Sequence, residues 1–420
     1  MNRQPLTDEL PYRFRSPRLN PVCLWMARAV ARSMLRDDHK IASIEMTGLD
    51  QVRPLLDQGD ALLFAPNHTD HADSHLMFEL SRRLGRPFYY MAAYQIFLGK
   101  RGWFLPRVGV FPVDREGADL TAFKTGVELL ARARNPLVIF PEGEMYHLGD
   151  RLTPLREGAV AVATTALKRL SDRSGNVWIV PVAIKYRFIE SCDPLPALHD
   201  LMDALERRAN WWVRRDLPLV ERIYRFALGM LCLKEYEYLG TPQSGGIPDR
   251  LTHLRESILT PIESRRLAGD RRAPNVPERI KSLRRACLDA LDAPDLDADA
   301  VLALKKDLHD VFVVAQIFSY PGDYVRAAPT LERAAETLMK FEEDFLGVFE
   351  VTPRAPRRAL VRLGRPIDVR ERLGSSGKAR TAIPAITIEL EAALQGLLDE
   401  FGPGRMIAGD ASGSSRSESR

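Results

Sequence analysis

Between residues 41 and 186, short apolar runs alternate with segments of helical periodicity, and this alternation limits the possible folds more than any other feature. The apolar runs predict strands over residues 41–46, 61–65, 88–92, 108–113, 137–140 and 177–184. The segments between them predict helices over residues 48–58, 74–84, 118–134 and 158–170. Such alternation favours an α/β fold with a largely parallel central sheet flanked by helices.

The second half of the chain has a different character. After Tyr186, helical periodicity interrupted by prolines continues to about residue 358, most clearly over 295–318 and 328–349. Strand character returns at 359–363, and a last helix is expected at 383–400. We therefore predict five regions: an N-terminal arm with an amphipathic helix (1–40), an α/β core (41–186), a long helical insertion (187–358), the closing strand and C-terminal helix of the core (359–401), and a disordered tail (402–420).

The composition narrows the compartment and the partners. The four cysteines are scattered without metal or redox spacing, which predicts buried, reduced thiols in a cytoplasmic protein. The net charge of +4 fits an anionic substrate or an anionic lipid surface, and no nucleic-acid partner is expected. Polar and charged residues interrupt the N-terminus, so no secretory signal is predicted. No apolar run reaches the ~18–20 residues that cross a bilayer, so we expect a peripheral protein at the inner face of the membrane.

Two segments join tryptophan to arginine, a composition that suits a lipid interface. Residues 21–35 predict a helix that carries Trp25 and a stripe of Arg28, Arg32 and Arg36. Residues 207–215 place two adjacent tryptophans among four arginines. Both segments can instead pack against their own domain, and the sequence leaves this choice open.

The stretch from Pro66 to His75 joins the strand at 61–65 to the next helix and holds three of the eight histidines. His68 and Asp73 can meet if His68 lies in the loop and Asp73 in the first helical turn. The carboxylate would then fix the imidazole tautomer and leave the other ring nitrogen free to accept a proton from a hydroxyl. No serine or cysteine nucleophile stands beside this pair, which suits direct attack by a substrate alcohol.

Two other interpretations of the same stretch remain open. Its polar residues can act as helix caps, with Asn67, Thr69 or Asp70 at the N-cap. They can also bind a metal, since histidines four residues apart share a helix face. The metal alternative uses His68, Asp70, His71, Asp73 and His75.

Three later motifs end or interrupt predicted strands. Arg115, at the end of Gly109–Arg115, can hold a phosphate with two parallel hydrogen bonds, or it can pair with Asp114 or Glu116. In Phe140-Pro141-Glu142-Gly143-Glu144, a carboxylate beside a glycine can bind a polyol hydroxyl, or the motif can be an ordinary turn. Pro181 inside an apolar run indicates a bulge or a shaped pocket wall.

The order of these four blocks resembles the glycerolipid acyltransferase family, which includes lysophosphatidate and glycerol-3-phosphate acyltransferases. The blocks are Asn67–Asp73, Gly109–Arg115, Phe140–Glu144 and Val180–Val182, and the resemblance covers about residues 40–186. Residues 364–367 resemble the closing strand of the family and the turn that follows it. Pro112, Glu144 and the long insertion depart from the common pattern and leave the acceptor open.

The resemblance implies a role for each matching residue. His68 would be the general base, Asp73 would orient it, and Arg115 would bind the phosphate of the acceptor. The predicted substrate-binding set is Asn67, Gly109, Arg115, Glu142, Gly143 and Pro181.

The activity that follows is transfer of a fatty acyl group from acyl-CoA or acyl carrier protein to a glycerophospholipid precursor such as 1-acylglycerol-3-phosphate. No metal and no cofactor beyond the acyl carrier is expected. The alternatives are a metal-dependent hydrolase and a non-catalytic scaffold on a membrane surface.

Overall fold

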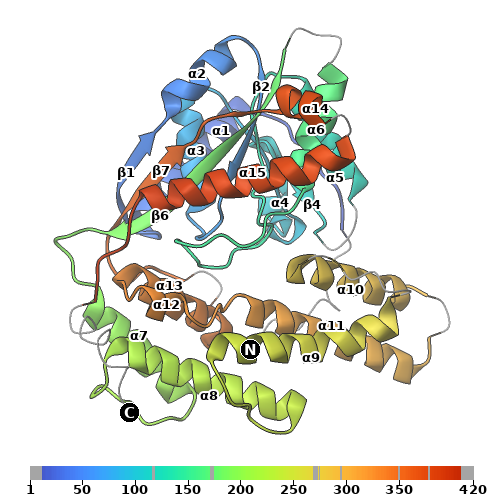
Figure 1. The fold of residues 1–420 in the computed structure, drawn as a ribbon. Coiled ribbons are helices and arrows are strands. Elements are labelled where there is room, and N and C mark those ends of the chain that lie inside the picture. Colours follow the sequence, from blue (N-terminus) through green and yellow to red (C-terminus); the bar gives the residue numbers. More distant parts are fainter. Residues whose placement is uncertain are drawn as a thin grey trace. The chain divides into compact units, whose positions relative to one another are not determined.

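The computed structural model describes residues 12–115, 119–170, 175–267, 273, 275–293, 296–348, 351–376 and 379–407. The chain forms two compact units. The first, called the α/β unit, comprises Pro11–Asp193 and Ala355–Pro403 (Figure 1). The second, called the helical unit, comprises Pro194–Arg354 and, among the described residues, 404–407.

The α/β unit is built on an eight-stranded sheet with the order β1-β7-β6-β2-β5-β3-β4, and β8 pairs with β6. Every neighbouring pair is parallel except β6–β7 and β6–β8. This confirms the predicted fold class. The strands are β1 (Ile41–Thr47), β2 (Ala61–Pro66), β3 (Tyr89–Ala93), β4 (Val110–Val113), β5 (Leu137–Val138), β6 (Val177–Phe188), β7 (Arg357–Leu363) and β8 (Ile367–Asp368).

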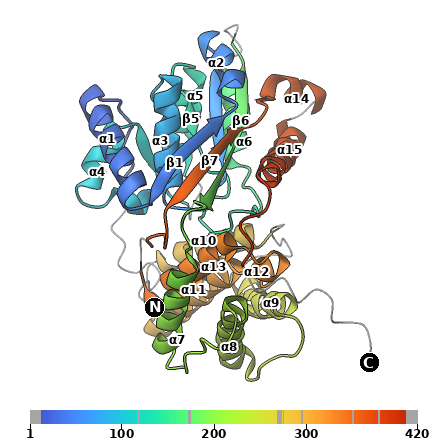
Figure 2. The same ribbon diagram turned by 90° about the vertical axis from the view of Figure 1, so that its left-hand side faces the viewer.

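Helices cover both faces of the sheet, which explains why β2 is apolar along its whole length. Leu63 and Ala65 of β2 point into the core on one face, and Leu62 and Phe64 point into the core on the other. Figure 2 shows α1 and α3 on one side of the sheet and α14 and α15 on the other. The helices are α1 (Pro21–Asp37), α2 (Leu49–Asp57), α3 (Asp73–Leu84), α4 (Arg101–Phe104), α5 (Leu120–Ala131), α6 (Gly158–Leu170), α14 (Val369–Ser376) and α15 (Ala379–Glu400), with 3-10 turns η1 (Tyr94–Phe97) and η2 (Leu105–Arg107).

Pro181 lies in the middle of β6, where a proline is unusual, and the break between β7 and β8 accommodates it. The Pro181 carbonyl accepts a hydrogen bond from the Gly364 amide at 2.9 Å, just beyond the end of β7. Pro181 has no amide hydrogen to donate, and its nitrogen faces the turn that joins β7 to β8. This turn needs no hydrogen bond from Pro181, because the pairing of β8 with β6 begins only at Ile179.

Several predicted boundaries differ from the structure. Strand β5 ends at Val138, one residue before the last amide that donates to β2, and β4 begins at Val110. The helix predicted at 328–349 is α13 (Leu331–Phe341) followed by the π-helical turn η3 (Glu342–Leu346). The predicted N-terminal arm and tail lie partly outside the described residues, which omit 1–11 and 408–420.

The described parts of these end segments form contacts with the rest of the chain. Leu19 forms a β-bridge with Val108, and Met406 forms one with Thr330. Each anchors to the unit that contains its partner.

Helix α15 is long and apolar enough to span a bilayer over Thr381–Glu400, and it is the one such helix among the described residues. Its apolar face also packs in the core of the α/β unit through Ile386, Leu390 and Leu394. A core helix of a water-soluble domain has the same composition, which is why this helix does not stand out in the sequence.

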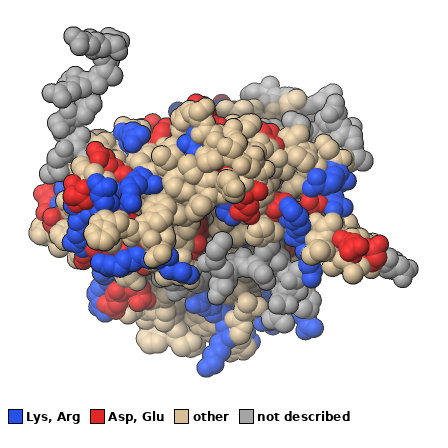
Figure 3. Space-filling model, turned by 90° about the horizontal axis from the view of Figure 1, so that it is seen from below, with Lys and Arg blue, Asp and Glu red and all other residues tan. Residues whose placement is uncertain are grey.

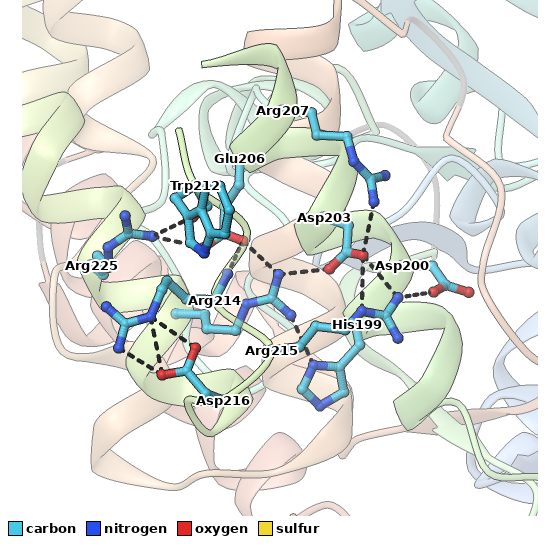
Figure 4. A network of polar contacts seen from close by, with 11 residues as sticks. His199, Asp200, Asp203, Glu206, Arg207, Trp212, Arg214, Arg215, Asp216 and Arg225 are labelled. Atoms are coloured by element: carbon cyan, nitrogen blue, oxygen red, sulfur yellow. Dashed lines mark hydrogen bonds and ion pairs between the residues drawn. The ribbon is translucent and has the colours of Figure 1, made fainter. Parts of the chain in front are cut away.

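Buried arginine–carboxylate pairs link the helices of the helical unit. Arg222 donates to Asp203 at 2.8 Å and to Glu206 at 2.6 Å, and all three side chains are buried. Figure 4 shows how His199, Arg214, Arg215 and Arg225 surround these two carboxylates. The helices are α7 (Leu195–Arg208), α8 (Leu219–Leu239), α9 (Ile247–Arg266), α10 (Val276–Leu291), α11 (Ala298–Phe318), α12 (Tyr324–Ala327) and α13.

The two adjacent tryptophans of this unit have opposite environments. Trp211 packs edge-on against Phe226, with ring centroids 5.4 Å apart, whereas Trp212 is 82% exposed. The neighbouring Arg214 and Arg215 are paired with aspartates.

A broad surface with few charged side chains is visible in Figure 3, and clusters of positive and negative side chains lie at its edges.

Candidate active site

His68 and Asp73 meet where β2 ends and α3 begins. His68 lies in the loop and Asp73 is the first residue of α3, as the spacing predicts. His68 Nδ1 lies 2.9 Å from Asp73 Oδ2. The His68 side chain is 26% exposed and Asp73 is completely buried. One imidazole nitrogen is thus held by the protein, and the partly exposed ring retains a second nitrogen for chemistry.

Asp73 is held by more than the histidine. Its Oδ2 also accepts hydrogen bonds from the amides of Thr69, at 2.7 Å, and Asp70, at 2.9 Å. Its Oδ1 accepts a hydrogen bond from the Tyr186 hydroxyl at 2.5 Å. The first turn of a helix also favours a carboxylate, since unpaired amides gather there. Together these donors fix the direction of a buried carboxylate.

Glu142 connects the third block to the histidine loop. Its Oε1 accepts a hydrogen bond from the His68 amide at 2.8 Å, and its Oε2 accepts two from Thr153, at 3.1 Å from the amide and 2.6 Å from the hydroxyl. Burial raises the pKa of this carboxyl, and these hydrogen bonds oppose the increase. Glu142 therefore holds two loops together, and its place in the acceptor site stays a prediction.

Arg115 reaches the third block from the end of β4. Its Nη1 donates to the Gly143 carbonyl at 2.9 Å and to the Glu144 carboxylate at 2.7 Å. Arg115 thus pairs with Glu144, 29 residues away. Gly143 has a φ of +76° and lies so close to Arg156 that a Cβ would come within 2.6 Å of Nε. Only glycine fits this position without strain.

The sheet places six predicted residues at one edge and two elsewhere. Beyond the carboxyl ends of β2, β4 and β5, where parallel sheets bind ligands, lie Asn67, His68, Asp73, Arg115, Glu142 and Gly143. The other two predicted site residues are Gly109, which precedes β4, and Pro181, which lies within β6.

Asn67, Gly109 and Pro181 each have a structural role in their surroundings. The Asn67 side chain is fully buried and bonds both backbone groups of Ile184. Gly109 precedes β4, at the opposite end of that strand from Arg115, and a Cβ there would come within 2.6 Å of the Phe88 carbonyl oxygen. Pro181 lies inside the sheet, opposite Ala65 of β2. All three residues shape the backbone.

Sequence reasoning missed several neighbours of the dyad. Phe140 packs on the His68 ring with centroids 4.3 Å apart. It belongs to the block Phe140–Glu144, but the sequence did not indicate this contact. Tyr186 and Arg357 lie outside every block, and Thr153 lies in a loop without periodicity. The only sequence signal for Arg357 was its position as a charged residue just before the strand predicted at 359–363.

Asp70 is a structural member of the histidine loop. Its Oδ2 accepts a hydrogen bond from Arg357 Nη1 at 2.8 Å, and its Oδ1 accepts one from the Ala72 amide at 2.8 Å. Burial alone would raise the pKa of Asp70, but Arg357 outweighs it and holds the pKa below the ordinary value. Among the described residues, no three His, Cys, Asp or Glu side chains group as metal ligands would.

The comparisons with known proteins concern this same part of the chain. Residues 43–185 match the family described as Acyltransferase. A 1-acyl-sn-glycerol-3-phosphate acyltransferase of Streptococcus pneumoniae is 28% identical over 110 residues, which are 26% of this chain and 39% of that relative. The alignment thus spans well under half of the relative. The region that holds the His68–Asp73 pair belongs to the glycerolipid acyltransferase family.

Proposed function

We propose that this protein transfers a fatty acyl group from a thioester, acyl-CoA or acyl carrier protein, to a hydroxyl of a glycerophospholipid precursor such as 1-acylglycerol-3-phosphate. The observation that carries the proposal is the 2.9 Å contact between His68 and a buried Asp73 at the carboxyl edge of the sheet. The similarity to a 1-acyl-sn-glycerol-3-phosphate acyltransferase supports the acceptor class.

This geometry supports the following reaction. His68 takes the proton of the acceptor hydroxyl while the hydroxyl oxygen attacks the thioester carbonyl carbon. The tetrahedral intermediate expels the thiolate, which takes the proton back from the imidazolium and leaves as a thiol. Asp73 stabilises the imidazolium in between, because its Oδ2 lies beside Nδ1. Holding alcohol and thioester together supplies much of the acceleration.

Replacing the base tests the mechanism. We expect His68→Ala to lower the rate of acyl transfer by about 10²–10⁴-fold, the range for loss of a general base, with unfolding by denaturant unchanged. The control is His253→Ala, on the exposed side of α9. A fully active His68→Ala protein excludes this mechanism.

Arg115 and Glu144 test whether the acceptor carries a phosphate. The phosphate must share or displace the Arg115–Glu144 ion pair. Arg115→Ala should raise the acceptor KM by about tenfold, whereas Glu144→Gln should lower it, because a competing anion is removed. Steady-state kinetics with 1-acylglycerol-3-phosphate and 1-acylglycerol distinguishes the two acceptors. A Glu144→Gln protein with unchanged KM for the phosphorylated acceptor contradicts phosphate binding by Arg115.

Helix α1 supports docking of the α/β unit on the cytoplasmic surface of a membrane. Its buried face consists of Cys23, Ala27, Ala31 and Leu35. Its opposite face leaves Val22, Trp25 and Val30 exposed, beside the arginine stripe. The start of this helix is joined to the segment that follows α4, since the Asn20 amide donates to the Arg107 carbonyl at 2.9 Å. The Arg107 guanidinium covers the ring of Trp103, an exposed residue of α4. Apolar and basic residues combined in this way suit an anionic lipid interface.

A further inference from the structure

Tyr186 completes the environment of Asp73 and lies outside the four blocks. Asp73 Oδ2 serves the His68 ring and two loop amides, whereas Oδ1 receives the Tyr186 hydroxyl at 2.5 Å. Tyr186 is buried, near the end of β6, opposite Ala359 of β7. The two oxygens of the carboxylate therefore have separate partners.

Arg357 fixes the tyrosine ring in place. Its guanidinium carbon lies 4.3 Å from the centroid of the Tyr186 ring. The same guanidinium donates to Asp70 at 2.8 Å and to the His39 carbonyl at 3.1 Å. A buried cation with two further anchors cannot easily leave the ring, so the hydroxyl stays directed at Asp73.

The Tyr186 hydroxyl also stays protonated. Burial, and then the carboxylates of Asp73 and Asp70, raise the pKa of Tyr186 well above its ordinary value. A protonated phenol beside a carboxylate can only donate. The hydrogen bond therefore persists over the pH range in which an imidazole titrates.

We propose that Tyr186 is a positioning residue of the acyl-transfer site. Its hydrogen bond holds Asp73 in the orientation that presents Oδ2 to His68, and it draws negative charge away from the imidazole. The inference rests on the proposed role of His68 as general base. Without the phenol, the carboxylate attracts a proton on His68 more strongly, so the base is occupied up to a higher pH.

Other charged groups around the pair must be held constant in the test. They are Glu142, which accepts from the His68 amide, Asp70 and Arg357 beside the loop, and His39 next to Asp70. Replacing tyrosine by phenylalanine changes none of them and retains the ring that Arg357 covers.

The test is the pH dependence of Tyr186→Phe. We expect the acid limb of the kcat/KM profile to move upward by about half a pH unit, and kcat near neutral pH to fall about tenfold with acceptor KM within about twofold. The control is Tyr90→Phe. Tyr90 is equally buried on β3, and its hydroxyl has no hydrogen-bond partner among the described residues. An acid limb that stays in place overturns the proposal, even if the variant is less stable.

A second readout does not depend on turnover. The His68 ring resonance, identified by its loss in His68→Ala, is titrated by NMR in the wild type and both phenylalanine variants. We expect a higher titration midpoint in Tyr186→Phe alone. Equal midpoints in the wild type and Tyr186→Phe overturn the inference. Failure to find acyl transfer would instead count against the proposed function and leave this measurement valid.

Discussion

At the scale of single residues, Gly143 shows how the third block depends on its backbone. An alanine at φ +76° costs about 1 kcal/mol, and its methyl would press on the Arg156 side chain. Gly59 has a φ of +80°, and a Cβ added there would meet nothing within 4 Å, so it isolates the backbone cost. We expect Gly143→Ala to lower both stability and activity, and Gly59→Ala to lower stability alone. Urea unfolding and acyl-transfer rates, measured on both variants, check this difference.

The Asp70–Arg357 pair yields a prediction with a pH dependence. Asp70→Asn leaves a buried guanidinium without its anion, which costs about 3–5 kcal/mol at neutral pH. Because the pKa of Asp70 is lowered in the folded protein, this stabilisation is complete above pH about 4 and is lost as the pH falls further. Urea unfolding between pH 7 and pH 3 should show that the difference in unfolding free energy between wild type and Asp70→Asn begins to narrow only at the acid end.

The double variant Asp70→Asn, Arg357→Met is the control for this pair. Removing both charges should restore part of the lost stability, because no unpaired charge remains buried. If the difference in unfolding free energy between wild type and Asp70→Asn is as large at pH 3 as at pH 7, the ion pair is not the source of that difference.

At the scale of elements, α1 carries the prediction about membrane binding. Trp25 is 71% exposed on α1, and Trp212 is 82% exposed on the helical unit. We expect Trp25→Ala to reduce binding to phosphatidylglycerol-containing vesicles about tenfold, and Trp212→Ala to leave it unchanged. Co-sedimentation at low and high salt measures both. Equal losses for the two variants would mean that α1 is not the docking element.

The elements also show where periodicity succeeds and where it fails. Helix α6 has its predicted bounds, because a fully periodic segment between clear turns leaves little choice. Strand β5 is shorter than its apolar run. Beyond Val138 the Ile139 amide still donates to the Phe64 carbonyl of β2, whereas Phe140 is half-buried outside the strand. An apolar run reports burial, and it cannot by itself distinguish a strand residue from a buried loop residue.

At the scale of the whole chain, the helical segment interrupts a β-ladder that is otherwise continuous. Phe188 pairs with Arg357 in the antiparallel β6–β7 ladder, and the Ile189 amide donates to the Pro356 carbonyl at 3.1 Å. The two ends of the insertion are therefore adjacent strand residues. A two-residue hairpin turn can join strands paired in this way.

We therefore expect residues 11–189 and 356–403, joined by Asn-Gly, to fold cooperatively and retain acyl transfer. Every described contact of the dyad comes from these residues. Cooperative urea unfolding and turnover of the lysolipid measure the outcome, with the same deletion carrying His68→Ala as the inactive control. A folded but inactive deletion would show that the helical unit contributes to catalysis.

The sequence alone was sufficient for the α/β class and for the His68–Asp73 pair, because periodicity and short-range spacing act within a few residues of the chain. Tertiary structure alone decided that Glu142 fastens the histidine loop, that Asn67, Gly109 and Pro181 shape the backbone, and that Tyr186 and Arg357 hold Asp73 and its loop. These contacts join residues from about 75 to almost 290 positions apart. The packing of the sheet sets them, and no local pattern encodes it.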